Sequence, residues 1–76
     1  MFGLSEKVLE NLTKKYQVGA RVKLISMNDV QAPPEGTLGT VFLVDDMGTI
    51  HVRWDNGSSL GVVYGADQCV VVSENK

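Results

Sequence analysis

The sequence predicts a mainly β fold, a small five-stranded barrel with one N-terminal α-helix. Two observations carry this prediction. The spacing of the apolar residues changes from a helical period to an alternating one near Val18, which is typical of a helix followed by strands. Farther along, the dipeptide Asn56-Gly57 separates two extended runs and predicts a tight hairpin with a type I′ turn. With 76 residues, the chain has the size of one domain of modest stability.

The helix is expected over residues 5–15. Ser5 is the predicted N-cap, since its hydroxyl can accept a hydrogen bond from a backbone N–H of the first turn. Three residues form one apolar stripe: Val8, Leu9 and Leu12. Because a helix this short is marginal alone in water, we expect it to pack against the rest of the chain.

Five strands are expected after the helix, separated by turns and by one long loop. The long loop covers residues 26–36 and contains a predicted turn at 33–36, where two prolines precede Glu and Gly. Residues 45–48 form the next turn, and residues 64–67 form a single helical turn. The strands are expected at residues 18–25, 37–44, 49–54, 58–63 and 68–72.

This order of elements is that of an SH3-like barrel. Such a barrel has five short strands, a long first loop, tight later turns and a helical turn before the last strand. Closing the sheet removes the exposed edges that an open five-stranded sheet would have to protect. The chain is therefore divided into a helical extension (1–17), an SH3-like barrel (18–72) and a tail (73–76).

Composition narrows the class of function. The net charge of −2 leaves no surplus of Lys and Arg to displace counterions from phosphates, which disfavours non-specific nucleic-acid binding. The single cysteine, Cys69, excludes an internal disulfide and fits a reducing compartment. The first residues lack the pattern of a signal peptide, and no apolar run is long enough to cross a bilayer. We expect a soluble cytoplasmic protein without membrane contact.

The sequence offers no catalytic, metal or cofactor site. A zinc site needs several His or Cys ligands, and His51 and Cys69 are the single members of their types. Asp45, Asp46 and Asp55 lie in predicted turns, where Asp typically accepts hydrogen bonds from its own backbone. Since no nucleophile stands beside an oriented base in the pattern, an enzyme is not expected.

Four segments carry a resemblance to a known family: residues 16–27, 34–41, 48–61 and 65–67. In order and with similar spacing, they resemble a small bacterial and phage family described only as a domain of unknown function. The resemblance covers roughly residues 16–72. It implies an SH3-like barrel and brings no activity with it.

Two shorter segments are similar to other families. Gly39-Thr40-Val41, followed by Val-Arg-Trp-Asp-Asn-Gly at 52–57, is similar to the Mind-bomb/HERC-type domain, an SH3-like module that binds protein segments. Residues 36–41 are similar to the start of a KOW-type motif, found in ribosomal and transcription-associated barrels. The chain departs from nucleic-acid-binding KOW barrels because it lacks basic clusters.

The alternating pattern also predicts an apolar patch on the outer face of the barrel. With a two-residue turn at Asn56-Gly57, Phe42 is expected across from His51, and His51 across from Val62. The patch would consist of Phe42, Val44, Leu60 and Val62. Three explanations are open. The N-terminal helix covers the patch, a bulge near Gly61 reverses the alternation and turns these residues inward, or a partner or second copy of the chain binds the patch. We favour the helix, through its apolar stripe.

The function predicted is that of a non-catalytic binding module for a protein or peptide. The ligand is expected between the 26–36 loop and the turn regions around 45–48 and 54–57, and the acidic residues would select a basic or amide-rich partner. Trp54 is in phase with the inward-facing strand residues, which favours the core over the rim. The expected contact residues are Met27, Asp29, Trp54, Asp55 and Tyr64.

Two alternatives remain open at this point. The first is nucleic-acid binding through Arg21, Lys23 and Arg53, whose side chains would point outward from adjoining strands with His51 nearby. The second is a structural or oligomerisation role in a larger assembly, with the outer apolar patch as the contact. For the chain by itself we expect a monomer or a weak homo-oligomer.

Overall fold

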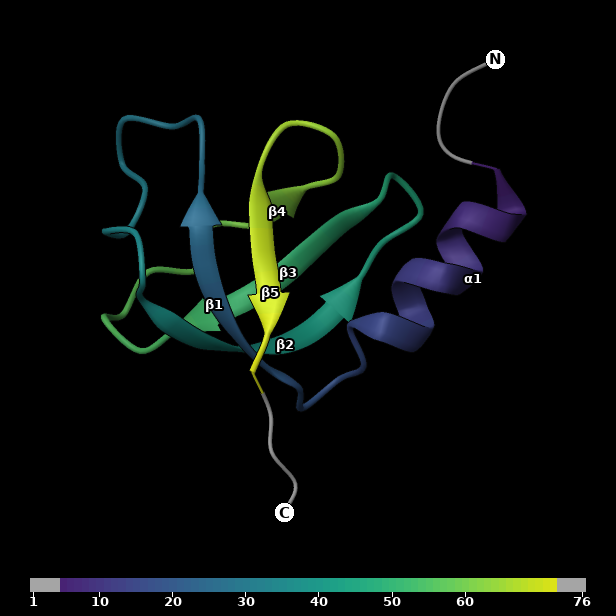
Figure 1. Ribbon diagram of the computed structural model, residues 1–76, viewed down its shortest axis with the longest axis horizontal. Helices are drawn as coiled ribbons and strands as arrows, with labels where there is room; N and C mark the ends of the chain where they lie inside the picture. The colour runs from purple at the N-terminus through teal and green to yellow at the C-terminus, as the bar shows by residue number, and fades with distance from the viewer. Residues whose placement is uncertain (1–4, 73–76) are drawn as a thin grey trace.

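The computed structural model describes residues 5–72, and its ribbon is shown in Figure 1. The mainly β class with one N-terminal helix is confirmed. Residues 1–4 and the tail predicted at 73–76 lie outside the described residues. The elements are α1 (Glu6–Lys15), β1 (Arg21–Ser26), β2 (Leu38–Val44), β3 (Thr49–Trp54), β4 (Val62–Val63) and β5 (Gln68–Val71).

All five strands form one antiparallel sheet with the order β4-β3-β2-β1-β5. Strands β1, β2 and β3 are consecutive neighbours, and β5 returns to pair with β1. Strands β4 and β5 are therefore the two edges, joined by one short turn (Figure 1). Among the described residues no ladder closes the sheet between them, so the structure shows a five-stranded sheet rather than a completed barrel.

The predicted bounds of the helix are confirmed to within one residue. The Ser5 hydroxyl accepts a hydrogen bond from the Val8 N–H at 3.2 Å, which makes Ser5 the N-cap. At the other end, the Tyr16 N–H donates to the Leu12 carbonyl at 2.8 Å and closes the last turn. Hydrogen bonds thus close both ends of α1 before the chain enters the sheet.

The core is built from the inward-facing residues of all five strands and two residues of the N-terminal segment. Burial of each large apolar side chain contributes roughly 1.5–3 kcal/mol, so these residues supply most of the stability. The buried residues are Leu12, Tyr16, Val22, Leu24, Val41, Ile50, Val52, Trp54, Val62 and Cys69. The members of this buried set in β1 and β3 lie at every second position, which confirms the alternation predicted for the first and third strands.

Strict alternation fails in β2. Val41 pairs with Val52, but His51 pairs with Leu43, so Phe42 is the extra residue of a β-bulge. Phe42 and Leu43 both point outward, 39% and 48% exposed. Beyond the bulge, Val44 turns back toward the core. The predicted pairing of Phe42 with His51 is therefore wrong by one residue, and Val44 does not belong to an outer patch.

The hairpin at Asn56-Gly57 exists, but its loop has three residues instead of two. The backbone N–H of Trp54 donates to the Ser58 carbonyl at 2.9 Å, and the backbone N–H of Gly57 donates to the Trp54 carbonyl at 2.9 Å. Gly57 has φ +96°, while no non-glycine among the described residues has a positive φ. The type I′ prediction is wrong because it required Asn56 to adopt a positive φ as well.

The longer loop shifts the pairing of β4 by one residue. Ile50 pairs with Val62, where a two-residue turn would have paired His51 with Val62. Val62 consequently faces the core and is 2% exposed. Neither a bulge near Gly61 nor a cover for an outer patch is needed, because the patch loses Val44 and Val62 to the interior. The predicted strand at 58–63 is reduced to its last two residues.

The turn in the long loop also lies one residue later than predicted. Thr37 donates to the Pro34 carbonyl at 3.1 Å, so the turn spans residues 34–37 with Gly36 at φ +92°. Gly36 itself donates to the Leu24 carbonyl at 2.8 Å, which returns the loop to β1. Pro33 thus precedes the turn, and Pro34 is its first residue instead of its corner.

The helix packs against the core and not against the outer face. Leu12 and Tyr16 belong to the buried cluster, and Val8 packs against it from the first turn of α1. Leu9 is only half-buried and is not part of the cluster. The prediction that the apolar stripe docks is correct for two of its three residues, while the predicted docking surface is wrong.

Candidate functional site

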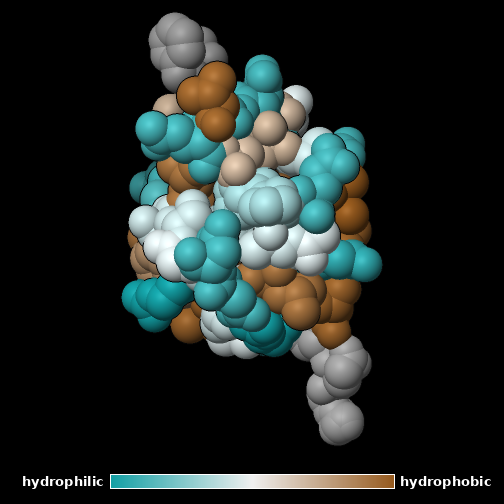
Figure 2. Space-filling model, turned by 90° about the vertical axis from the view of Figure 1, so that its left-hand side faces the viewer, coloured by the Kyte–Doolittle hydropathy of each residue, from teal (hydrophilic) through white to brown (hydrophobic). Residues whose placement is uncertain are grey.

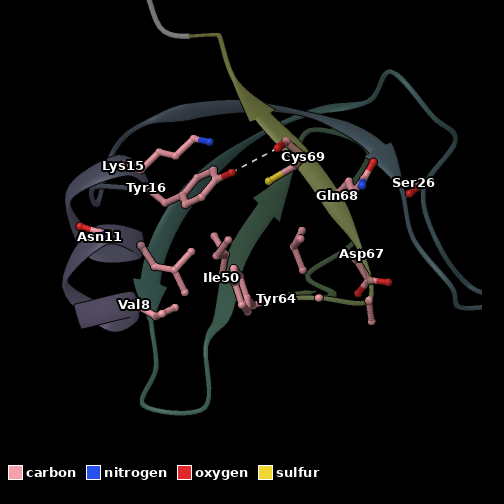
Figure 3. Close-up of a pocket in the computed structure, with 14 residues that line it drawn as sticks. Val8, Asn11, Lys15, Tyr16, Ser26, Ile50, Tyr64, Asp67, Gln68 and Cys69 are labelled. Atoms are coloured by element: carbon pink, nitrogen blue, oxygen red, sulfur yellow. Dashed lines mark hydrogen bonds between the residues drawn. The ribbon is translucent and has the colours of Figure 1, made fainter. Parts of the chain in front are cut away.

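A groove lies between α1 and the turn that joins β4 to β5 (Figure 3). Its volume is about 560 Å³. The floor is apolar and consists of core residues: Leu12, Ile50, Val62 and Cys69. The helix wall carries Val8, Asn11 and Lys15, and the opposite wall carries residues 64–68. Tyr16 and Ser26 complete the lining.

The wall opposite the helix is held in place by hydrogen bonds. Ala66 and Asp67 both donate their N–H groups to the Val63 carbonyl, at 3.0 and 2.9 Å, which confirms a turn at residues 64–67. The turn is not helical as predicted, because Gly65 has φ +89°. The Asp67 carboxylate accepts from the N–H groups of Asn28 at 2.9 Å and Val63 at 3.0 Å. Asp67 therefore fixes the groove wall to β4 and to the start of the long loop. The sequence signal for this role was the position of Asp67 at the end of a short turn.

Tyr16 and Cys69 form the closed end of the groove. The Tyr16 hydroxyl donates to the Cys69 carbonyl at 3.3 Å, as the dashed line in Figure 3 marks. Burial is the main cause that raises the pKa of Tyr16, and burial raises the pKa of the Cys69 thiol to about 11. Both groups are protonated at neutral pH. The hydrogen bond from Tyr16 also gives a partner to one backbone carbonyl of the edge strand β5.

Few charges reach the groove. Both oxygens of the Asp67 carboxylate already accept backbone hydrogen bonds. The Lys15 ammonium lies 5.4 Å from the centroid of the Tyr16 ring, a cation–π distance. The remaining side chains at the rim, including Asn11 and Gln68, are neutral hydrogen-bonding groups. The groove can therefore bind apolar side chains on its floor and polar backbone groups at its rim.

The predicted contact residues do not come together in one site. Trp54 is 1% exposed, and its Nε1–H donates to the Leu60 carbonyl at 2.8 Å. The favoured core position of Trp54 is thus confirmed, and the indole has no surface left for a ligand. Tyr64, 50% exposed, does line the groove. Sequence reasoning missed the groove's other wall because α1 and the β4–β5 turn meet only in the folded chain.

Met27 and Asp29 lie in the long loop, away from the 45–48 turn. Met27 is half-buried against the core, and the Asp29 carboxylate accepts from the Gln31 N–H at 2.7 Å within its own loop. Strand β3 has six residues, about 20 Å, and separates the 45–48 turn from residues 55–57. On the loop side of the molecule, shown in Figure 2, hydrophilic and hydrophobic residues are mixed and the centre is hydrophilic to neutral.

Asp55 is engaged by Arg21 in a two-pronged ion pair. Its oxygens lie 2.9 and 2.6 Å from the guanidinium nitrogens, and the same guanidinium lies 2.9 Å from the Thr40 hydroxyl. The hydrogen bond from Arg21 lowers the pKa of Asp55 and raises that of Arg21. The Arg21 guanidinium thus already pairs with the charge through which Asp55 was predicted to select a basic partner.

The three basic residues of the strands lie on the outer face of the sheet, the side opposite the core. Arg21 is paired with Thr40, and Thr40 with Arg53, so the two arginines share one row across three strands. Lys23 lies two residues farther along β1. The predicted outward orientation of Arg21, Lys23 and Arg53 agrees with the burial pattern of β1 and β3.

Asp45 and His51 lie at the end of this face near the first hairpin. One Asp45 oxygen accepts from the N–H groups of Met47 and Thr49, at 2.9 and 3.0 Å, which confirms its role in the turn. The other oxygen lies 2.9 Å from His51 Nε2. Within residues 5–72 no group of three potential metal ligands is found, and no helix has the length and hydrophobicity needed to cross a membrane.

Comparison with known proteins identifies a family for this chain. A family model described as a domain of unknown function, DUF4314, matches residues 5–72, which include α1 and all five strands. The comparisons with curated proteins and with solved structures gave no match.

Proposed function

The chain belongs to the DUF4314 family, a domain of unknown function, and we propose from its geometry that it is a non-catalytic binding module for a protein segment. The groove between α1 and the β4–β5 turn carries this proposal. It offers an apolar floor at the surface of the molecule, bounded by the exposed Tyr64 and by neutral amide side chains.

The composition of the groove favours a protein segment as the ligand. An apolar centre with a polar rim is the usual arrangement of a protein-binding surface, and tyrosine is common among the residues that contribute most to binding. The groove is open along one side between the helix and the turn (Figure 3). One or two apolar side chains of an extended segment would fill the floor, while its backbone meets Asn11 and Gln68 at the rim.

The chemistry of the groove supports binding without catalysis. The pKa of about 11 keeps the Cys69 thiol protonated at neutral pH, and a protonated thiol is a poor nucleophile. The Tyr16 hydroxyl donates its proton to a backbone carbonyl of the same chain. The Asp67 carboxylate is used by two backbone N–H groups. Tyr16 and Asp67 thus have structural tasks, and the Cys69 thiol is buried and protonated.

We also propose that the sheet is an SH3-like barrel. The support is its order of elements: a long loop after β1, two tight hairpins, and one hydrogen-bonded turn before β5. The edge strands β4 and β5 contact one another and are linked by this single turn. The Tyr16 hydroxyl also gives a hydrogen-bond partner to one carbonyl of the edge strand β5.

The test uses peptides selected on the protein itself. A phage-displayed library of random peptides is selected against the chain, and the selected peptides are titrated by calorimetry. Ala66 is exposed and lines the groove, so Ala66→Arg should block it and weaken binding at least tenfold, about 1.4 kcal/mol. Val30→Arg, at an exposed position in the long loop, is the matched control. Equal affinity for both variants would overturn the proposal.

A further inference from the structure

The outer face of β2 and β3 carries a second surface with its own chemistry. We propose that this face binds single-stranded nucleic acid, with Phe42 and Arg53 as the pair on which a base stacks. This surface is separate from the groove, which lies between α1 and the β4–β5 turn. The proposal therefore does not depend on a peptide binding there.

The outer face of β2 carries two exposed apolar side chains in a row. Alternation after the buried Val41 places Phe42 outward, and the bulge turns Leu43 to the same face. The Arg53 guanidinium carbon lies 5.1 Å from the centroid of the Phe42 ring. The His51 ring lies 5.9 Å from the same centroid and is tilted by 50°. An aromatic ring next to a guanidinium plane is a typical platform for an unpaired base.

The charges on this face favour an anionic ligand. Arg21, Lys23 and Arg53 are the basic residues of the described strands, and all three are on the outer face. Two carboxylates form ion pairs with residues of this face. Asp55 binds Arg21, and Asp45 lies 2.9 Å from His51. Lys23 and Arg53 have no carboxylate partner within the described part of the chain.

The predicted binding is local and modest. The whole chain has a net charge of −2, so long-range attraction to phosphates is weak and binding has to be measured at low salt. Contacts with two or three phosphates would give a slope of log K against log salt of about −1.4 to −2.1 for a single strand. The stacking on Phe42 adds an affinity that salt does not remove.

The experiment is fluorescence anisotropy with labelled oligothymidylate and oligoadenylate of about ten nucleotides, a length within the site sizes of small β folds. Phe42→Ala should raise the dissociation constant at least about fivefold, as expected for a lost stacking contact. Leu43→Ala removes the neighbouring exposed side chain and is the matched control, with a change of less than about twofold. Thermal melts verify that each variant is folded.

A second pair of variants separates local contact from general charge. Arg53→Gln should weaken binding and reduce the salt slope by about 0.7, the value for one phosphate contact. Lys7→Gln removes the same charge from the exposed surface of α1 and should leave both unchanged. Absence of binding at low salt, equal effects of Phe42→Ala and Leu43→Ala, or equal effects of Arg53→Gln and Lys7→Gln would each overturn the proposal.

Binding to the wild-type chain is located by NMR, which does not depend on the folding of a variant. The oligonucleotide should shift the amide resonances of residues 40–43 and 51–53, whereas a peptide in the groove should shift those of residues 64–69. Oligonucleotide shifts confined to 64–69 would contradict this proposal and leave the peptide proposal standing. Displacement of the oligonucleotide by an equal concentration of oligoglutamate would also contradict it, because a base-stacking site discriminates against a purely acidic peptide.

Discussion

The Asp45 carboxylate interacts with three groups at the end of the first hairpin. Its carboxylate accepts hydrogen bonds from two backbone N–H groups of the turn and lies beside His51. The interaction with His51 is the main cause that lowers the pKa of Asp45 below its ordinary 3.8. The ionised form is thus favoured in the folded chain compared with the unfolded chain.

This lowered pKa predicts a specific dependence of stability on pH. Its contribution is present above the pKa of Asp45 in the unfolded chain and is lost as the pH falls through the lower pKa in the folded chain. We expect Asp45→Asn to lower the melting temperature at pH about 7 and to reduce the loss of stability on acidification to pH about 2.5. Asp46→Asn, on the adjacent exposed residue, is the control. Identical pH profiles of the two variants would contradict the role of Asp45.

Trp54 shows what the sequence can and cannot predict about a single residue. Its phase with the alternating residues of β3 correctly predicted that it faces the core. The sequence could not show that the Leu60 carbonyl would accept its indole N–H, because that contact depends on the path of the irregular segment 58–61. With its polar group satisfied inside the fold, Trp54 is a structural residue.

At the scale of an element, the second hairpin shows the limits of a turn motif. Asn56-Gly57 correctly marked a hairpin but not the length of its loop, since both a two-residue and a three-residue loop can place glycine at a positive φ. The difference of one residue changes which face every residue of β4 occupies. The bulge at Phe42 likewise depends on more than the sequence of one strand. It is set by the pairing of β2 with β3, and no single-strand pattern encodes it.

The conformation of Gly57 gives a prediction for this element. At φ +96°, a side chain is strained, so Gly57→Ala should lower the free energy of unfolding by about 1–2 kcal/mol. No atom lies within 4 Å of the position that a Cβ would occupy, so the cost is one of backbone strain and not of crowding. Urea denaturation measures it, with Ser59→Ala, an exposed neighbour, as the control. A change below about 0.5 kcal/mol would mean that the turn has a different conformation.

At the scale of the whole molecule, α1 contributes to the same core as the sheet. The boundary predicted at residue 17 followed the change of hydrophobic period, and the buried cluster has members on both sides of it. Leu12 and Tyr16 share one buried cluster with residues of all five strands. The groove was unpredictable for the same reason. Its walls come from α1 and from residues 64–68, which are distant in the sequence and meet only after the sheet has formed.

Two leucines of α1 test whether the helix is integral to the domain. Leu12 is buried in the core and lines the groove floor, so Leu12→Ala should cost about 2–5 kcal/mol of stability through lost burial and the cavity left behind. Leu9 is half-buried and lies outside the core cluster. Leu9→Ala is the same chemical change at this position in α1, and it should cost less than about 1 kcal/mol of stability. Because a domain of this size has only a few kcal/mol to lose, Leu12→Ala should leave much of the chain unfolded in thermal melts at neutral pH. If both variants melted like the wild type, the strands would form the domain without α1, and the groove would lose one of its walls as a fixed part of the fold.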